Sequence, residues 1–465
     1  MFRCFPIPTS CIFIDGTTRA RSSQSIPYML SFLCARSRLR VFVTQIRNPP
    51  SFASLSPSFS TMASNINAAR AKIAEQVKID ILSKDPVEDN KLKCKEIGRT
   101  FISDTITVPT KEMYQYAVLS TLGDDVYHEP STAALEAHLA QLLGKEAALF
   151  VASGTASNQI ALRSHLKQPP HSVLCDHRAH IYKYEAGGVG FHSQAAVTPV
   201  IPANGHHLAL SDVEANTIIS SDVHFAPTEV IALENTLNGT IIPQEEVIAI
   251  SDFAHSNNIK MHLDGARLWH VAAETGVSLK ELSDPFDSVS ICFSKGLGAP
   301  IGSCLVGSKE LIKKARWFRK LFGGGMRQTG ILAGCAAYAL SHNFPLLPKV
   351  HELARKLETG LEKIGAEITS RAETCMASVF YDPSPIGVDY GEIADRAILL
   401  PEPLFLGGSR LVVHIQTTEQ AIDDFLSLVA QLAEEKKQAG FVHQPVEKKT
   451  GRYHDVYVRQ PPKQA

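Results

Sequence analysis

The sequence lacks a strong charge of either sign, because its 465 residues carry a formal net charge of −1. A near-neutral chain offers no broad field to nucleic acid or to an anionic membrane, so neither is expected as its main partner. Internal repeats and low-complexity segments are absent, and the apolar stretch IPYMLSFLCA is too short to span a bilayer. The composition, 44% hydrophobic and 20% charged, is ordinary for a globular chain of two or three domains.

Paired cysteine motifs are also missing. The nine cysteines are scattered and odd in number, and no C-x-x-C occurs. This pattern argues against a disulfide framework and against a zinc site of the usual spacing, and it favours a reducing compartment. Most thiols are therefore expected to be small core side chains, and no metal site is predicted.

Lysine and acidic residues are nearly absent from residues 1–61, which hold seven arginines, no lysine and one acid, Asp15. The segment is rich in serine, and this composition is typical of a mitochondrial presequence. Its six prolines weaken the amphipathic helix that such a leader needs. Translation from Met62, which leaves the protein cytoplasmic, is an equal alternative. On either interpretation, we expect residues 1–61 to lie outside the fold.

Short apolar runs alternate with helical segments across the middle of the chain. The expected strands are AALFVA (147–152), SVLCD (172–176), EVIALEN (229–235), IKMHLD (259–264) and SVSICF (288–293). Strands that alternate with helices predict βαβ units and a mostly parallel sheet. In such sheets, ligands bind outside the carboxyl ends of the strands.

The pattern changes again after about residue 345, where a long helix, short strands and a last helix are expected. We therefore predict the α/β fold class, with a large, mostly parallel sheet domain over 101–345 and a smaller C-terminal α+β domain over 346–438. A helical arm over 62–100 and a polar tail over 439–465 are expected to flank these domains.

Lys295 ends one of the apolar runs, and a lysine is costly at the end of a buried strand unless it is paired or neutralised. The run before it ends in the same way, with Asp264, 31 positions earlier. A βαβ unit takes roughly 30 residues and places both strand ends at one edge of the sheet. An acid and a lysine at one edge suit pyridoxal phosphate (PLP), whose aldehyde bonds to a lysine and whose pyridinium an acid keeps protonated.

A phosphate site for that cofactor is indicated by LFVASGTASNQIAL, where a strand is followed by Gly154, Thr155 and a helix start. Free N–H groups at a helix N-terminus bind anions, although a capped helix without a ligand is at least as common. The glycines of AGGVG do not follow a clear strand, and FGGGMRQ lacks the Gly-Lys-Ser/Thr of an ATP loop. Arg327 in the latter stretch remains a candidate phosphate contact.

Longer stretches around these residues resemble one family. They are HLDGARLWHVAAETGV, DSVSICFSKGLGAPIGSCLVGS, FRKLFGGGMRQTGILAG, CDHRAHIYKYEAGG, SDTITVPTKEM, GDDVY and SGTASNQIALRSHL. In type and order they are similar to the low-specificity threonine aldolases, especially the fungal branch, from about residue 101 to about 430. The resemblance implies the aspartate-aminotransferase-type PLP fold (fold type I) and a homotetramer with active sites at subunit interfaces.

The resemblance also assigns roles to single residues. Lys295 would bond to the cofactor aldehyde, and Asp264 would pair with the pyridinium nitrogen. The other implied cofactor-binding residues are Arg267, Gly154, Thr155, His180 and Arg327. The residues implied to bind the substrate or act on it are Ser103, Arg267, Arg410, His180, His224 and Tyr127. His180 would stack on the ring and serve the substrate hydroxyl, with His224 nearby, and Tyr127 would enter from a neighbouring subunit.

The sequence departs from the family pattern in four places. Ile102 stands where arginine is usual, and the acidic stretch after GDDVY is shortened to His128-Glu129. Leu237, which fungal members share, stands where bacterial members carry histidine, and Cys375 stands where asparagine is usual. None belongs to the implied cofactor set, so the departures concern the range of substrates rather than PLP binding.

The implied reaction is retro-aldol cleavage of a small amino acid, L-threonine or L-allo-threonine, to glycine and acetaldehyde, for glycine supply or threonine breakdown. Two alternatives stay open. Some fungal proteins of this type are alanine racemases, which need proton-transferring groups on both faces of Cα, and the sequence identifies only Lys295 for one face. A non-catalytic subunit on the same fold is the other alternative, against which Lys295, Asp264 and the phosphate loop argue.

Overall fold

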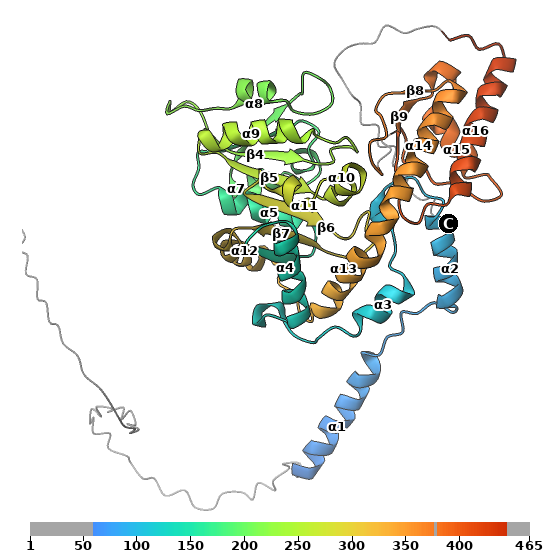
Figure 1. Cartoon of the computed structure of the whole chain (residues 1–465). Helices are drawn as coiled ribbons and strands as arrows, with labels where there is room; N and C mark the ends of the chain where they lie inside the picture. Colours follow the sequence, from blue (N-terminus) through green and yellow to red (C-terminus); the bar gives the residue numbers. More distant parts are fainter. Residues whose placement is uncertain (1–58, 376–378, 444–465) are drawn as a thin grey trace, which may run out of the picture. The chain divides into compact units, whose positions relative to one another are not determined.

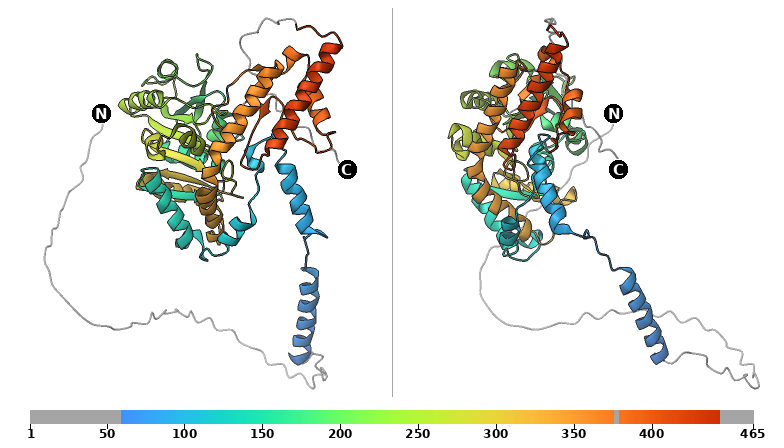
Figure 2. Two further views of the ribbon diagram at one scale, coloured as in Figure 1. Left: turned by 45° about the vertical axis from the view of Figure 1, so that its right-hand side comes forward. Right: turned by 90° about the vertical axis from the view of Figure 1, so that its right-hand side faces the viewer.

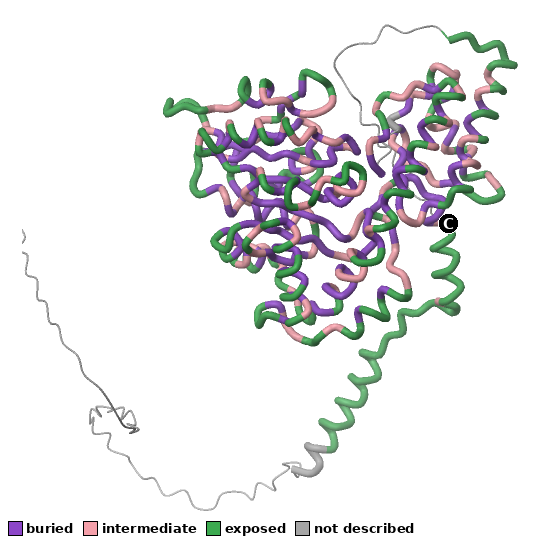
Figure 3. The backbone as a smooth tube through the Cα atoms, in the orientation of Figure 1, coloured by how far each residue is buried: buried purple, intermediate pink, exposed green. Residues whose placement is uncertain are grey.

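The computed structural model describes residues 59–375 and 379–443. The chain divides into two compact units, 1–81 and 82–465. The described part of the first unit contains α1 (Phe59–Gln76), whose described side chains are all exposed (Figure 3). The predicted helical arm over 62–100 therefore holds two helices of different units, because α2 (Pro86–Ile97) belongs to the second. Among the described residues, no helix is both long and apolar enough to cross a membrane.

A seven-stranded sheet organises the second unit, with strand order β1-β7-β6-β5-β4-β2-β3 (Figure 1). Its strands are β1 (Ala147–Val151), β2 (Ser172–Asp176), β3 (Ala196–Val200), β4 (Thr228–Glu234), β5 (Lys260–Gly265), β6 (Ser288–Cys292) and β7 (Ser303–Gly307). The pairings from β3 through β2, β4 and β5 to β6 are parallel, and β7 runs antiparallel to β6 and β1. This mostly parallel sheet confirms the predicted fold class.

Helices lie on both faces of this sheet. They are α3 (Lys111–Ala117), α4 (Pro130–Leu142), α5 (Gly154–His165), α6 (His180–Lys183), α7 (Gly188–Ser193), α8 (Leu210–Asn216), α9 (Gln244–Ser256), α10 (Leu268–Thr275), α11 (Leu279–Ser283), α12 (Lys309–Leu321) and α13 (Gly330–Asn343). The two faces explain why the strands read as unbroken apolar runs. In β2, Leu174 packs in one buried cluster, and its neighbours Val173 and Cys175 pack in another.

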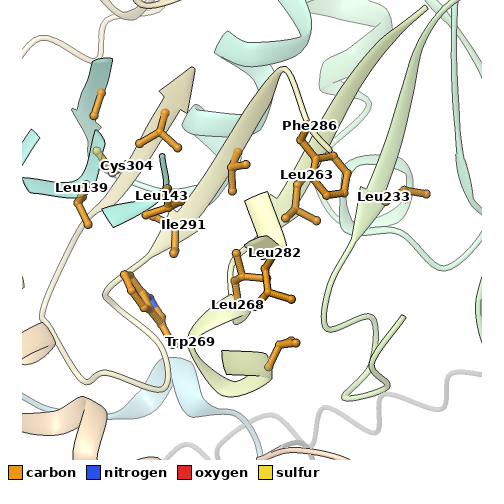
Figure 4. Packing of buried hydrophobic residues seen from close by; sticks show 14 of the residues in the cluster. Leu139, Leu143, Leu233, Leu263, Leu268, Trp269, Leu282, Phe286, Ile291 and Cys304 are labelled. Carbon is orange, nitrogen blue, oxygen red and sulfur yellow. The ribbon is translucent and has the colours of Figure 1, made fainter. Parts of the chain in front are cut away.

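The larger cluster fills the space between the sheet and helices α4, α9, α10 and α13. Figure 4 shows its centre, where Leu263 of β5 and Ile291 of β6 lie near Leu268 and Trp269 of α10. The Trp269 indole N–H donates to the Cys292 carbonyl at 2.8 Å. This bond ties the start of α10 to the end of β6, so the core fixes the segments that follow β5 and β6.

A second hydrophobic cluster lies in the C-terminal part of the second unit and includes Phe101, which stands between α2 and α3 in the chain. It is built from α14 (Leu347–Ile364), β8 (Glu367–Ile368), β9 (Val379–Asp382), α15 (Tyr390–Ala397), β10 (Arg410–Leu411) and α16 (Glu419–Gln438). Helices α14 and α16 lie side by side (Figures 1 and 2). The two separate clusters support our division into domains near residue 345, which stays a proposal.

Candidate active site

Three strands of the sheet end in polar residues at one edge. Strand β4 ends in Glu234, which pairs in register with Asp264 near the end of β5. Strand β6 lies beside β5 in parallel, and Lys295 follows it by three residues. The structure therefore brings Asp264 and Lys295 to the same edge, where the Lys295 charge favours the ionised form of nearby carboxyl groups, Glu234 among them.

The Asp264 carboxylate is buried, and two donors hold it in place. Asn158 of α5 donates its side-chain N–H to Oδ2 at 2.7 Å, and the backbone N–H of Ala266 donates to Oδ1 at 3.1 Å. Behind Asn158, its amide oxygen meets His262 Nε2 at 3.1 Å. Burial lowers the pKa of His262 to about 4, so this ring is neutral at neutral pH.

His180 starts α6 and lies close to this carboxylate. One ring nitrogen of His180 and one carboxylate oxygen each of Glu185 and Asp264 lie within 4.8 Å of one another. His180 Nδ1 contacts Glu185 Oε1 at 2.8 Å, and its backbone N–H donates to Glu234 at 2.7 Å. Because a carboxylate only accepts, Nδ1 carries the proton and Nε2 of neutral His180 is free to act as a base.

Two neighbouring carboxyl groups set the ionisation of this histidine. Burial alone lowers the pKa of His180, but the hydrogen bond to Glu185 and the Asp264 charge raise it above its ordinary value. Burial and the Asp264 charge raise the pKa of the half-buried Glu234 to about 8. Asn158 donates to both Glu185 and Asp264, so an amide lies between these carboxylates. Sequence reasoning missed Asn158, Glu185 and Glu234, although the first two stand in the quoted motifs.

Arg267 is held by a residue that sequence reasoning also missed. Its Nε and Nη2 atoms donate to the two oxygens of Asp104 at 2.8 and 2.6 Å, and the Asp104 side chain is fully buried. Burial alone raises the pKa of Asp104, but the Arg267 and Lys295 charges hold it well below its usual range. The only sequence signal for Asp104 is its place between Ser103 and Thr105 in the SDT stretch.

The SDT segment reaches the lysine loop by hydrogen bonds. Thr107 Oγ1 lies 2.9 Å from the carbonyl oxygen of Asp104 and 3.2 Å from that of Lys295, so its one proton is shared between these two acceptors. Ser103 caps the short turn η1 (Asp104–Ile106), and its hydroxyl accepts from Thr105. Gly407 packs directly on the backbone of Ile102 and on the carbonyl of Arg410, so Ser103 and Arg410 lie on neighbouring segments.

The predicted phosphate residues lie at the start of α5. Ser153 caps this helix through the N–H of Ala156, and Gly154 and Thr155 form its first turn. A Cβ on Gly154 would lie 2.8 Å from Cys292 Sγ, so the helix start approaches the end of β6 closely. The start of this 12-residue helix, where the first N–H groups have no partner within the helix, therefore lies beside the end of β6, three residues before Lys295.

Of the predicted residues, His224 lies away from this group within one chain, and Tyr127 and Arg327 are exposed. His224 precedes β4, at the amino end of the strand whose carboxyl end carries Glu234, so the strand of roughly 20 Å separates them. The ring is 82% exposed and pairs with Asp222 at 2.6 Å. Tyr127 is 82% exposed, and Arg327 is 71% exposed and paired with Asp124. Tyr127 and Arg327 lie on segments joined by the bond from the Met326 N–H to Asp125 at 2.9 Å.

The residues at the strand ends fit PLP in chemical type. A carboxylate fixed by two donors suits a pyridinium N–H, and a lysine at the end of the next strand suits an aldehyde. The helix N-terminus beside Cys292 suits a phosphate. Arg267 is already neutralised by Asp104, so it serves as a fixed donor rather than as an unpaired charge.

Solved structures of similar shape share this architecture, which is that of PLP-dependent enzymes of fold type I. A threonine aldolase of Leishmania major superposes with a TM-score of 0.60 at 19% identity, covering 72% of this chain and 99% of that one. A serine palmitoyltransferase of Sphingomonas wittichii gives 0.56 at 15% identity, covering 82% and 100%. At these identities the likeness defines the fold alone.

Sequence comparison defines the family. The chain belongs to the beta-eliminating lyase family, which matches residues 100–383. A probable low-specificity L-threonine aldolase of Schizosaccharomyces pombe is 44% identical over 335 residues, covering 72% of this chain and 87% of the relative. The low-specificity L-threonine aldolase of Saccharomyces cerevisiae is 42% identical over 342 residues (73% and 87%). An alanine racemase of Cochliobolus carbonum is 37% identical over 337 residues (70% and 86%).

Proposed function

We propose that this protein is a PLP-dependent aldolase that cleaves L-threonine or L-allo-threonine to glycine and acetaldehyde. The observation that carries the proposal is the arrangement of His180, Asp264 and Lys295 at the strand ends. A histidine base beside a buried acid and a lysine is what the cleavage of a β-hydroxy amino acid needs. The aldolase relatives, each matched over most of its length, support the same reaction.

PLP, when bound, supplies a protonated ring that takes up the electron pair of the broken Cα–Cβ bond. Asp264 would retain the ring proton, since Asn158 and Ala266 fix its carboxylate in one orientation. Gly154 and Thr155 would hold the phosphate, and Lys295 the aldehyde. Arg267, oriented by Asp104, would donate to the cofactor and to the substrate.

The substrate must be held so that its Cα–Cβ bond breaks rather than another bond at Cα. We assign its carboxylate to Arg410 and Ser103, which lie on neighbouring segments beside the Lys295 loop. A planar guanidinium binds a carboxylate with two parallel hydrogen bonds and so fixes its orientation. Nε2 of His180, with Nδ1–H donating to Glu185, would remove the β-hydroxyl proton.

The proposal includes a homotetramer. In it, each subunit would complete the site of a neighbour with Tyr127, Arg327 and His224. Large apolar side chains stand exposed in the segment that precedes Tyr127, with Leu119 82% and Leu122 86% exposed, and exposed apolar surface of this kind supports a contact with another subunit. His224 is exposed at the opposite sheet edge, where only another chain would bring it to a site.

A second candidate function is amino-acid racemisation, favoured by the racemase relative at 37% identity. One assay separates the two. Purified holoenzyme is mixed with L-threonine, L-allo-threonine or L-alanine, and acetaldehyde and D-alanine are measured. We expect acetaldehyde from at least one threonine isomer and no D-alanine. Formation of D-alanine without acetaldehyde would replace the aldolase proposal with the racemase. If neither product forms, both proposals are refuted.

A further inference from the structure

A line of ionisable side chains runs from the Lys295 loop to the protein surface. His270 of α10 contacts His351 of α14 through Nδ1 and Nε2 at 2.9 Å. His351 Nδ1 contacts Glu274 Oε2 at 2.7 Å, and Arg355 donates to the other Glu274 oxygen at 2.8 Å. Both histidines are 1% exposed, whereas the Glu274 side chain is 30% exposed and reaches water.

The hydrogen bonds determine which ring nitrogens carry protons. Glu274 only accepts, so His351 Nδ1 is protonated and, in the neutral ring, His351 Nε2 accepts. His270 Nδ1 must then donate, which leaves His270 Nε2 without a proton. Burial and the neighbouring histidine lower the pKa of His270 to about 3, and burial lowers that of His351, so both rings are neutral at neutral pH.

The basic nitrogen at the inner end of this line faces the lysine loop. A Cβ on Gly296, the residue after Lys295, would lie 2.2 Å from His270 Nε2. This nitrogen is buried and, among residues 59–375 and 379–443, has no hydrogen-bond partner. A ring nitrogen of His270 also lies within 4.8 Å of an Asp104 oxygen and Cys375 Sγ. An unprotonated, unpaired nitrogen is unusual in a protein interior and indicates a role other than packing.

We propose that His270, His351 and Glu274 form a proton relay between the buried Lys295 loop and solvent. A proton accepted at His270 Nε2 releases the Nδ1 proton to His351 Nε2, and the His351 Nδ1 proton passes to Glu274 and water. Both rings then hold the opposite tautomer, so the next proton must travel inward. The relay thus carries one proton out and one in.

This alternation matches the proton balance of the proposed cleavage, on which the functional part of the inference rests. The cleavage removes one proton from the β-hydroxyl and returns one to Cα. Burial, His351 and the Arg267 charge lower the pKa of His270, and the Asp104 carboxylate raises it. The low resulting pKa means that a proton accepted by His270 is passed on rather than held. His270 and His351 are relay residues rather than catalytic ones, since no observation places them against the substrate.

The sharpest variant is His351→Gln, whose amide oxygen can still accept from His270 but cannot pass a proton on. His342→Gln is the matched control, because His342 is exposed and its contacts, a hydrogen bond to the Tyr338 carbonyl and stacking on the Tyr338 ring, stay within α13. We measure the exchange of glycine Cα hydrogens in D2O by NMR, with its solvent isotope effect, and the tautomer of His270 by 15N NMR of the holoenzyme.

In His351→Gln we expect exchange to fall on the order of tenfold or more, with the His270 tautomer unchanged and the isotope effect altered. In His351→Ala, imidazole should restore exchange and 1-methylimidazole, which cannot pass a proton on, should not. Exchange at the wild-type rate, or slower exchange with an unchanged isotope effect and no rescue, overturns the relay. Failure of the proposed function can be told apart from failure of the relay. In that case, the wild-type enzyme exchanges glycine hydrogens but releases no acetaldehyde from either threonine isomer.

Discussion

Arg267 and Asp104, 163 positions apart in the sequence, meet in a buried bidentate ion pair. Removing one partner of such a pair leaves the other charge uncompensated in the interior, at a cost of about 3–5 kcal/mol. We therefore expect Asp104→Asn to lower the free energy of unfolding by about this amount, measured by urea denaturation. Asp104→Asn should also weaken PLP binding, because Arg267 loses its fixed orientation.

The control is Glu435→Gln, which breaks the exposed bidentate pair with Arg396. Exposed pairs contribute about 1 kcal/mol or less, so this variant should unfold close to the wild type. Equal stability of Asp104→Asn and the wild type would contradict the importance of the buried pair.

Lys295→Ala tests the assignment of the cofactor lysine. We expect it to abolish acetaldehyde release and to remove the absorbance band that borohydride fixes to the protein. The fold should persist, because Lys295 is only half-buried at the end of β6. Lys260→Ala serves as the control, because Lys260 is an exposed residue of β5 that pairs with Asp287. This variant should keep both acetaldehyde release and the absorbance band. Normal turnover in Lys295→Ala would show that the site has been misassigned.

The parts of the fold that sequence predicts best are the buried strands. The apolar runs at 172–176 and 288–293 become β2 and β6, because a strand covered on both faces must be apolar at every position. β3, β7 and α15 were not predicted. β3 is half exposed and contains Pro199, and β7 reads as a continuation of the glycine-rich stretch, so neither stands out by its pattern.

For the site, sequence supplies the residues whose spacing follows from one crossover, such as Asp264 and Lys295. It does not supply Asp104, whose partner Arg267 is brought to it by the packing of both hydrophobic clusters. Sequence also did not predict that His224 lies at the amino end of β4, because a motif does not say whether it precedes or follows a strand. Pairings that depend on tertiary packing leave no local pattern.

Glu185→Gln tests the histidine assigned as the base. The Glu185 hydrogen bond raises the pKa of His180, so the variant should lower that pKa toward its ordinary value. If neutral His180 accepts the hydroxyl proton, activity is lost as pH falls through this pKa. The acidic limb of the kcat/KM profile should therefore move to lower pH in Glu185→Gln. An unmoved limb, with a lowered His180 pKa measured by NMR, would assign the base to another group.

Gly154→Ala tests the close approach at the phosphate loop. The added methyl would lie 2.8 Å from Cys292 Sγ, and overpacking of a rigid interior costs about 1–3 kcal/mol. The backbone of Gly154 is otherwise helical, where alanine is favoured, so any loss of stability arises from this contact. We expect a lower Tm and weaker PLP binding, and Cys292→Ala in the same chain should recover most of the Tm. Both single variants and the double variant are compared by thermal unfolding, and a double variant as unstable as Gly154→Ala would place the strain elsewhere.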